Sequence, residues 1–148
     1  MSLQKQVMEQ MKVAMKSKNT VALTALRALK SAFMLANTEA GAEEMSEGEE
    51  LKIIQKQVKQ RKDSAAIFKE QGREDLAEPE LAEAAILEQF LPEALSEAAI
   101  EEVVKETISK IGAEGMKDMG KVMGIVSKQL AGKADGKAIS TLVRKNLV

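Results

Sequence analysis

Residues 46–72 decide the fold and read SEGEELKIIQKQVKQRKDSAAIFKEQG. Ser46 is followed three residues later by Glu49, which is the spacing of a capping box at a helix start. Gly72 stands where helices commonly end, because glycine adopts a left-handed conformation at little cost. Apolar residues recur between these ends at helical spacing, at Leu51, Ile54, Val58, Ala65 and Phe68. The segment therefore predicts one long amphipathic helix.

Two more apolar stripes precede this segment, and both have helical spacing. The first consists of Leu3, Val7, Met11 and Met15. The second consists of Leu23, Leu26, Leu29 and Phe33, with a helix start at Asn19-Thr20 and an end at Gly41. No segment shows the alternating pattern of a strand, so these stripes predict an all-α fold.

Helix-capping and helix-breaking residues after Gly72 predict four further helices. Pro79 suits the first turn of a short fourth helix, and Pro92 marks a break. The caps predicted for the last three helices are Ser96, Asp118 and Asp135, with Gly112 and Gly132 between them. We therefore expect about seven helices in two subdomains, a four-helix part at residues 1–92 and a three-helix part at residues 93–148.

Histidine and cysteine are both absent, which removes the side chains used most often for acid–base and thiol chemistry. The serines lack a Gly-x-Ser-x-Gly pattern. Residues 132–137, GKADGK, are similar to a phosphate loop but have three residues between the glycines instead of four, and Ala138 replaces the Ser or Thr that binds magnesium. We therefore predict a binding protein that is not an enzyme and has no cofactor and no metal.

Charge is segregated along the chain although the net charge is only −1. Residues 74–106 contain eleven acids and one lysine, whereas residues 113–148 contain seven basic residues and three acids. The acidic block is typical of solvated helix faces. Arg61 falls within an apolar stripe, and a hypothesis for it is an ion pair with a carboxylate such as Glu83 on the fourth helix.

The best candidate binding surface lies on the sixth helix. Lys117, Lys121 and Lys128 fall within a sector of about 40° when a helix turns by about 100° per residue. Gly120 and Gly124 flank this sector and would let a phosphate chain or another helix approach closely. The basic residues that follow are Lys133, Lys137, Arg144 and Lys145. The alternative is an ordinary solvated face whose glycines serve helix packing.

Two groups of motifs resemble the YqeY-like family. The first is KQRKDSAAIF at residues 59–68, followed by Gly72-Arg73, Asp75-Leu76 and Phe90-Leu91-Pro92. The second is DMGKVMG at residues 118–124, followed by Ala134-Asp135-Gly136. The family in turn resembles the C-terminal tail domain of GatB, a subunit of the aspartyl/glutamyl-tRNA amidotransferase. The resemblance implies an all-helical fold in two subdomains.

The resemblance also implies a function. Gly120, Lys121, Gly124, Asp135 and Gly136 match motif positions in the last three helices of the tail, which helps to hold tRNA. The basic residues beside them become candidates for RNA contacts. The family label, a carbon–nitrogen ligase with glutamine as donor, is not matched by catalytic residues. The chain has no room for the kinase-like body of GatB and lacks the Ser-Ser-Lys signature of the glutaminase subunit.

We therefore expect a freestanding tRNA-binding module that assists an amidotransferase. Its three phenylalanines lie on apparent core stripes or beside Pro92, so recognition of the folded RNA backbone is favoured over base stacking. The alternative is a protein–protein adaptor that docks an amidotransferase subunit or another helical partner. No signal peptide and no membrane span is predicted, and the expected location is the cytoplasm.

Overall fold

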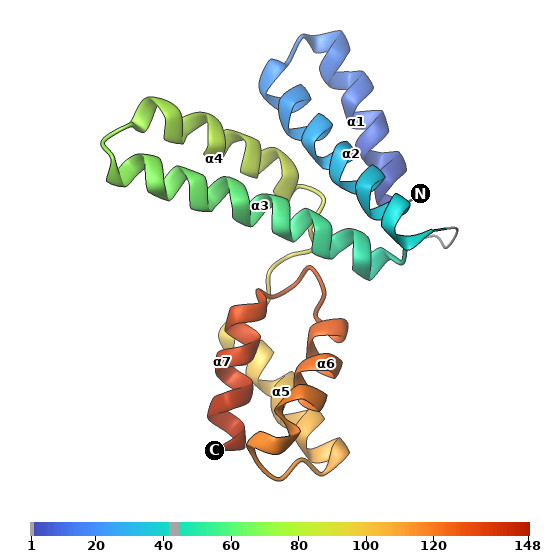
Figure 1. The fold of residues 1–148 in the computed structure, drawn as a ribbon, viewed down its shortest axis with the longest axis vertical. Helices are drawn as coiled ribbons and strands as arrows, with labels where there is room; N and C mark the ends of the chain where they lie inside the picture. Colours follow the sequence, from blue (N-terminus) through green and yellow to red (C-terminus); the bar gives the residue numbers. More distant parts are fainter. Residues whose placement is uncertain (1, 42–44) are drawn as a thin grey trace. The chain divides into compact units, whose positions relative to one another are not determined.

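The computed structural model describes residues 2–41 and 45–148. All regular secondary structure in this part of the chain is helical (Figure 1). The α-helices are α1 (Leu3–Ser17), α2 (Thr20–Ala40), α3 (Glu47–Glu70), α4 (Glu74–Glu88), α5 (Glu97–Ile111), α6 (Met119–Gln129) and α7 (Gly136–Leu147). A short 3-10 helix, η1 (Met116–Asp118), precedes α6. The prediction of an all-α fold with about seven helices is confirmed.

The start of α3 forms the capping box that its sequence predicts. The Ser46 hydroxyl accepts a hydrogen bond from the Glu49 N–H at 3.2 Å, and the Glu49 carboxylate accepts one from the Ser46 N–H at 2.7 Å. Asn19, Ser96 and Asp135 likewise cap α2, α5 and α7 through their side chains. These short polar side chains satisfy N–H groups that no helical carbonyl can reach, which fixes where each helix begins.

Contacts divide the chain into two compact units, an N-terminal unit up to Leu91 and a C-terminal unit from Pro92 to Val148. The core of the N-terminal unit is built mainly from the predicted stripes and includes Leu3, Val7, Leu26, Leu29, Phe33, Ile54, Val58, Leu87 and Phe90. Met15 departs from the prediction because Ala14 is the buried residue at the end of α1 and Met15 is exposed. No described helix is both long and apolar enough to cross a membrane.

The core of the C-terminal unit joins one face from each of its three α-helices. Its buried residues are Ile100, Val104, Val122, Val126, Leu130, Ile139, Leu142, Val143 and Leu147. The loops add a backbone hydrogen bond from the Leu95 N–H to the Lys133 carbonyl, at 2.9 Å. This core holds the helices whose outer faces carry the candidate binding residues.

Helix α4 begins earlier than Pro79 predicts. It starts at Glu74, which places Pro79 inside the helix and not in its first turn. Proline removes the hydrogen bond that residue 79 would otherwise donate to the carbonyl of residue 75. Asp75 is exposed, so water can take the place of that bond, while buried Ala77 holds the first turn against the core. Packing therefore extends the helix across its proline.

Helices α3 and α4 are tied by a charged cluster around Arg61. Its guanidinium lies 3.6 Å from the Glu83 carboxylate, which is the ion pair that the sequence predicts for Arg61. It also lies 3.3 Å from the Glu80 carboxylate. Burial raises the pKa of Glu83 above its ordinary 4.5, Glu80 adds to the rise, and Arg61 opposes it. Arg61 thus keeps two neighbouring carboxylates together at a partly buried helix interface.

Arg61→Met is expected to lower the free energy of unfolding by about 1 kcal/mol near neutral pH. The expected loss is larger than the contribution of an exposed ion pair and smaller than the cost of removing one partner of a fully buried pair. Solvent partly screens this half-buried cluster. Glu83 binds its proton more tightly in the folded than in the unfolded chain, so stability falls as pH rises from about 4.5 through its raised pKa. Removing Arg61 raises that pKa further and steepens the fall.

Urea unfolding followed by circular dichroism, at about pH 4.5 and near neutral pH, measures both effects. Lys12→Met is the matched control, because Lys12 pairs with Glu9 at an exposed site on α1. Unchanged or higher stability of Arg61→Met near neutral pH would show that the cluster does not stabilise the interface between the helices.

Candidate nucleic-acid interface

Helix α6 has a buried face and an exposed face. Val122 and Val126 are completely buried in the core of the C-terminal unit. Lys121 and Lys128 lie on the exposed face, about 20° apart at about 100° per residue. The helix contains no Asp or Glu between its ends, so its exposed face has no carboxylate of its own. We call this pair of lysines the α6 cationic row.

Helix α7 repeats the arrangement. Lys137 in its first turn and Arg144 in its last turn are seven residues apart, and therefore also about 20° apart around the helix. Both are exposed, and α7 has no acidic residue. We call them the α7 cationic row. Exposed Lys133 lies in the loop that joins α6 to α7.

The predicted cations differ in their ion pairs. Lys145 lies 3.5 Å from the Glu101 carboxylate of α5, so its charge is offset within the protein. The two cationic rows, Lys117 and Lys133 form no ion pair with any residue of 2–41 or 45–148. Six of the seven predicted cations therefore have no ion-pair partner within the described chain, whereas Lys145 is paired with Glu101.

The segment before α6 departs from the sequence prediction. Lys117 lies in η1 and not in α6, although it remains exposed. Asp118 does not cap α6 with its side chain, because its carboxylate accepts a hydrogen bond from the Glu114 N–H at 2.9 Å. Gly115, with φ of 132°, turns the chain just before η1. Asp118 thus stabilises this preceding turn.

Gly120 and Gly124 share the exposed face of α6. A Cβ atom added at either position would meet no atom within 4 Å, so contacts within the protein do not require glycine there. Asp135 caps α7 by accepting from the Lys137 N–H at 3.4 Å, and Gly136 is the first residue of that helix. Gly136 also has open space around it. Close approach of a partner to these glycines stays a prediction.

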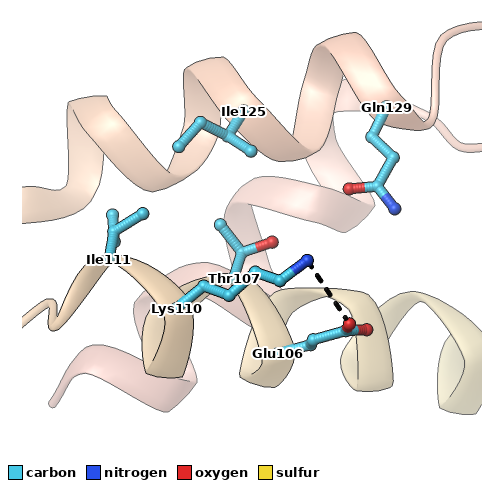
Figure 2. A pocket seen from close by; sticks show the side chains of 6 residues that line it. All are labelled: Glu106, Thr107, Lys110, Ile111, Ile125 and Gln129. Carbon is cyan, nitrogen blue, oxygen red and sulfur yellow. Dashed lines mark ion pairs between the residues drawn. The ribbon is translucent and has the colours of Figure 1, made fainter.

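A groove of about 230 Å³ runs between α5 and α6 (Figure 2). It is lined by Glu106, Thr107, Lys110, Ile111, Ile125 and Gln129. An ion pair at 3.8 Å joins Glu106 to Lys110 on the α5 side. On α6, Ile125 is one turn beyond Lys121 and Gln129 directly follows Lys128, so the groove borders the α6 cationic row.

The sequence prediction missed this groove, although one signal for it was present. Ile100, Val104 and Thr107 are the buried residues of α5 and follow one another at helical spacing. A threonine at the end of an apolar stripe is a polar group that needs a partner. Among the described residues, no group of three or more His, Cys, Asp or Glu side chains is placed to hold a metal ion.

Comparison with known proteins gives one family and two kinds of relative. A sequence profile described as Yqey-like protein matches residues 4–147. "Altered inheritance of mitochondria protein 41, mitochondrial" of Pyrenophora tritici-repentis is 32% identical over 139 residues, which are 91% of this chain and 75% of that protein. The GatE-type subunit of glutamyl-tRNA(Gln) amidotransferase from Thermococcus gammatolerans is 40% identical over 84 residues, 54% of this chain. The matching part is only 13% of that relative's length.

Proposed function

Because the chain belongs to the Yqey-like protein family, we propose that it is a tRNA-binding module that assists a tRNA-dependent amidotransferase. The observation that carries the proposal is the pair of cationic rows on α6 and α7, which are exposed and have no carboxylate on their own helices. The relatives named as glutamyl-tRNA(Gln) amidotransferase subunits supply the choice of tRNA as the polyanion.

The mode of binding follows from the side chains available. Lysine contacts a phosphate as a point charge and reads no sequence. Phe33 and Phe90 are buried, and Phe68 is half-buried, so no fully exposed aromatic ring among them offers a stacking platform. The proposal is therefore recognition of the folded RNA backbone. The proposal includes no catalysis by this chain, which has neither histidine nor cysteine. The proposed location is the cytoplasm.

Binding to unfractionated tRNA is expected at micromolar concentration in about 50 mM salt and to weaken more than about tenfold in about 200 mM salt. The loss arises because each lysine that meets a phosphate releases a bound counterion, and added salt opposes that release. Filter binding with end-labelled tRNA at the two salt concentrations measures the effect. An absence of binding at low salt would remove the proposed function.

A protein–protein adaptor is the second candidate. The adjacent residues Met34 and Leu35 on α2, which are 59% and 63% exposed, favour it, because exposed large apolar side chains occur at protein contact surfaces. The relatives named as amidotransferase subunits suggest the partner. Affinity capture from a lysate with and without nuclease separates the two functions. An amidotransferase subunit retained after nuclease treatment supports the adaptor.

A further inference from the structure

Thr107 lies at the floor of the groove between α5 and α6 and differs from the other threonines inside helices. Thr24, Thr38 and Thr141 each donate a hydrogen bond to the carbonyl four residues earlier, at 2.9–3.0 Å. Thr107 is only 6% exposed, yet its hydroxyl has no such bond and no other partner among the described residues. Figure 2 shows its oxygen directed into the groove. Its oxygen is not among the fully enclosed polar atoms that lack a partner, so the groove leaves the hydroxyl open to a group that enters from outside the chain.

The remaining walls define the chemistry of that partner. Ile111 and Ile125 are partly exposed and present apolar surfaces at one end of the groove, while the Gln129 amide faces it from α6 (Figure 2). The volume of about 230 Å³ is below the ~300–1,000 Å³ of pockets for whole small-molecule ligands. The groove thus suits one flat group with apolar faces and hydrogen-bonding edges, and an aliphatic side chain would leave Thr107 unsatisfied.

The positive charges beside the groove suit a partner that also carries a phosphate. Lys121 and Lys128 lie on the same exposed face of α6 as Ile125. The single carboxylate in the groove, that of Glu106, is offset by Lys110. A group that enters the groove can therefore be attached to an anion held by the α6 cationic row.

We infer that the groove accepts one unstacked nucleobase of the bound RNA, while the adjoining phosphate lies on Lys121 and Lys128. This inference rests on the proposed RNA-binding function and adds a base-sized site to it. The base lies between Ile111 and Ile125, and its edge bonds to the Thr107 hydroxyl and the Gln129 amide. A binding mode otherwise limited to the backbone thereby gains one contact that can depend on sequence.

Methyl NMR of the whole chain, labelled at the isoleucine δ1 positions, tests the site with four ribonucleoside 5′-monophosphates at millimolar concentration. We expect upfield shifts of the Ile111 and Ile125 signals from the ring of the base, and no shift at Ile54 in the core of the N-terminal unit. Ribose 5-phosphate, which has no base, should leave both groove signals unchanged. Equal shifts with this compound, or none with any nucleotide, would overturn the inference.

Thr107→Val and Thr107→Ser form a matched pair. Loss of the hydroxyl in Thr107→Val should weaken nucleotide binding about fivefold, as one lost hydrogen bond predicts, while Thr107→Ser retains most of it. Equal affinity of the two variants would contradict the assigned hydrogen bond. N-acetyl-leucinamide is the further probe, and stronger binding of this compound than of the nucleotides would assign the groove to a protein side chain. The tRNA titration decides the proposed function separately, because it requires no base in the groove.

Discussion

The triple variant Lys117→Glu, Lys121→Glu and Lys128→Glu is expected to bind tRNA at least about 100-fold more weakly at low salt. If each charged contact contributes about 1 kcal/mol, three contribute about 3 kcal/mol, which corresponds to about 100-fold in affinity. The slope of log affinity against log salt concentration should also become shallower by about 3, because each phosphate-contacting lysine contributes about 1. Filter binding across a salt series measures both quantities.

The matched control changes three exposed lysines of the N-terminal unit, Lys5, Lys16 and Lys18, to glutamate. Both variants carry the same change in net charge. A general electrostatic effect would weaken them equally, whereas binding at η1 and α6 weakens only the first. Equal affinities of the two triple variants would place the RNA contacts elsewhere, even if the wild-type protein binds tRNA with a steep salt dependence.

Features that depend on neighbouring residues could be predicted from the sequence. The Ser46–Glu49 capping box and the glycine after α3 depend on a few adjacent residues, and the structure contains both. The apolar stripe of α3 also predicts its buried residues Ile54 and Val58. Local signals suffice here because hydrogen bonds at helix ends and the spacing of apolar residues are set within a few turns.

Features that depend on packing between distant segments could not be predicted in the same way. The helix preference of proline predicts Pro79 in the first turn of α4. Burial of Ala77 instead lets α4 begin at Glu74, five residues before Pro79. Lys117 lies in η1 because the turn at Gly115 and the Asp118 carboxylate shape the chain before α6. The exposure of Lys121 and Lys128 followed from helical spacing, whereas the pairing of Lys145 with Glu101 depends on how α7 lies against α5.

The groove of the candidate site also could not be predicted from the sequence. Its walls come from α5 and α6, and Thr107 and Ile125 are eighteen residues apart in the chain. Thr107 is buried on α5 and Ile125 is exposed on α6, and the pattern of either helix alone does not bring the two residues together. A concave site between two helices follows from their packing, and that arrangement becomes visible only in three dimensions.

The double variant Gly120→Ala and Gly124→Ala is expected to be more stable than the wild type and to bind tRNA less well. Both glycines lie in α6 with open space where a Cβ would be added. Alanine favours a helix over glycine by about 0.8–1 kcal/mol per position, so the free energy of unfolding should rise by about 1–2 kcal/mol. The added methyl groups stand where an RNA backbone approaches the α6 cationic row, and affinity should therefore fall. Urea unfolding and filter binding measure the two effects.

Gly124→Leu extends the test, because a larger side chain on the same face should weaken tRNA binding at least about tenfold while leucine still favours the helix over glycine. Ser127→Ala, on the half-buried side of α6, is the control and should leave affinity unchanged. Stability and binding then change in opposite directions at Gly120 and Gly124, which a role in helix packing alone does not predict. If the alanine and leucine variants gain stability and retain wild-type affinity, the RNA does not approach this face of α6, and the two glycines have no part in binding.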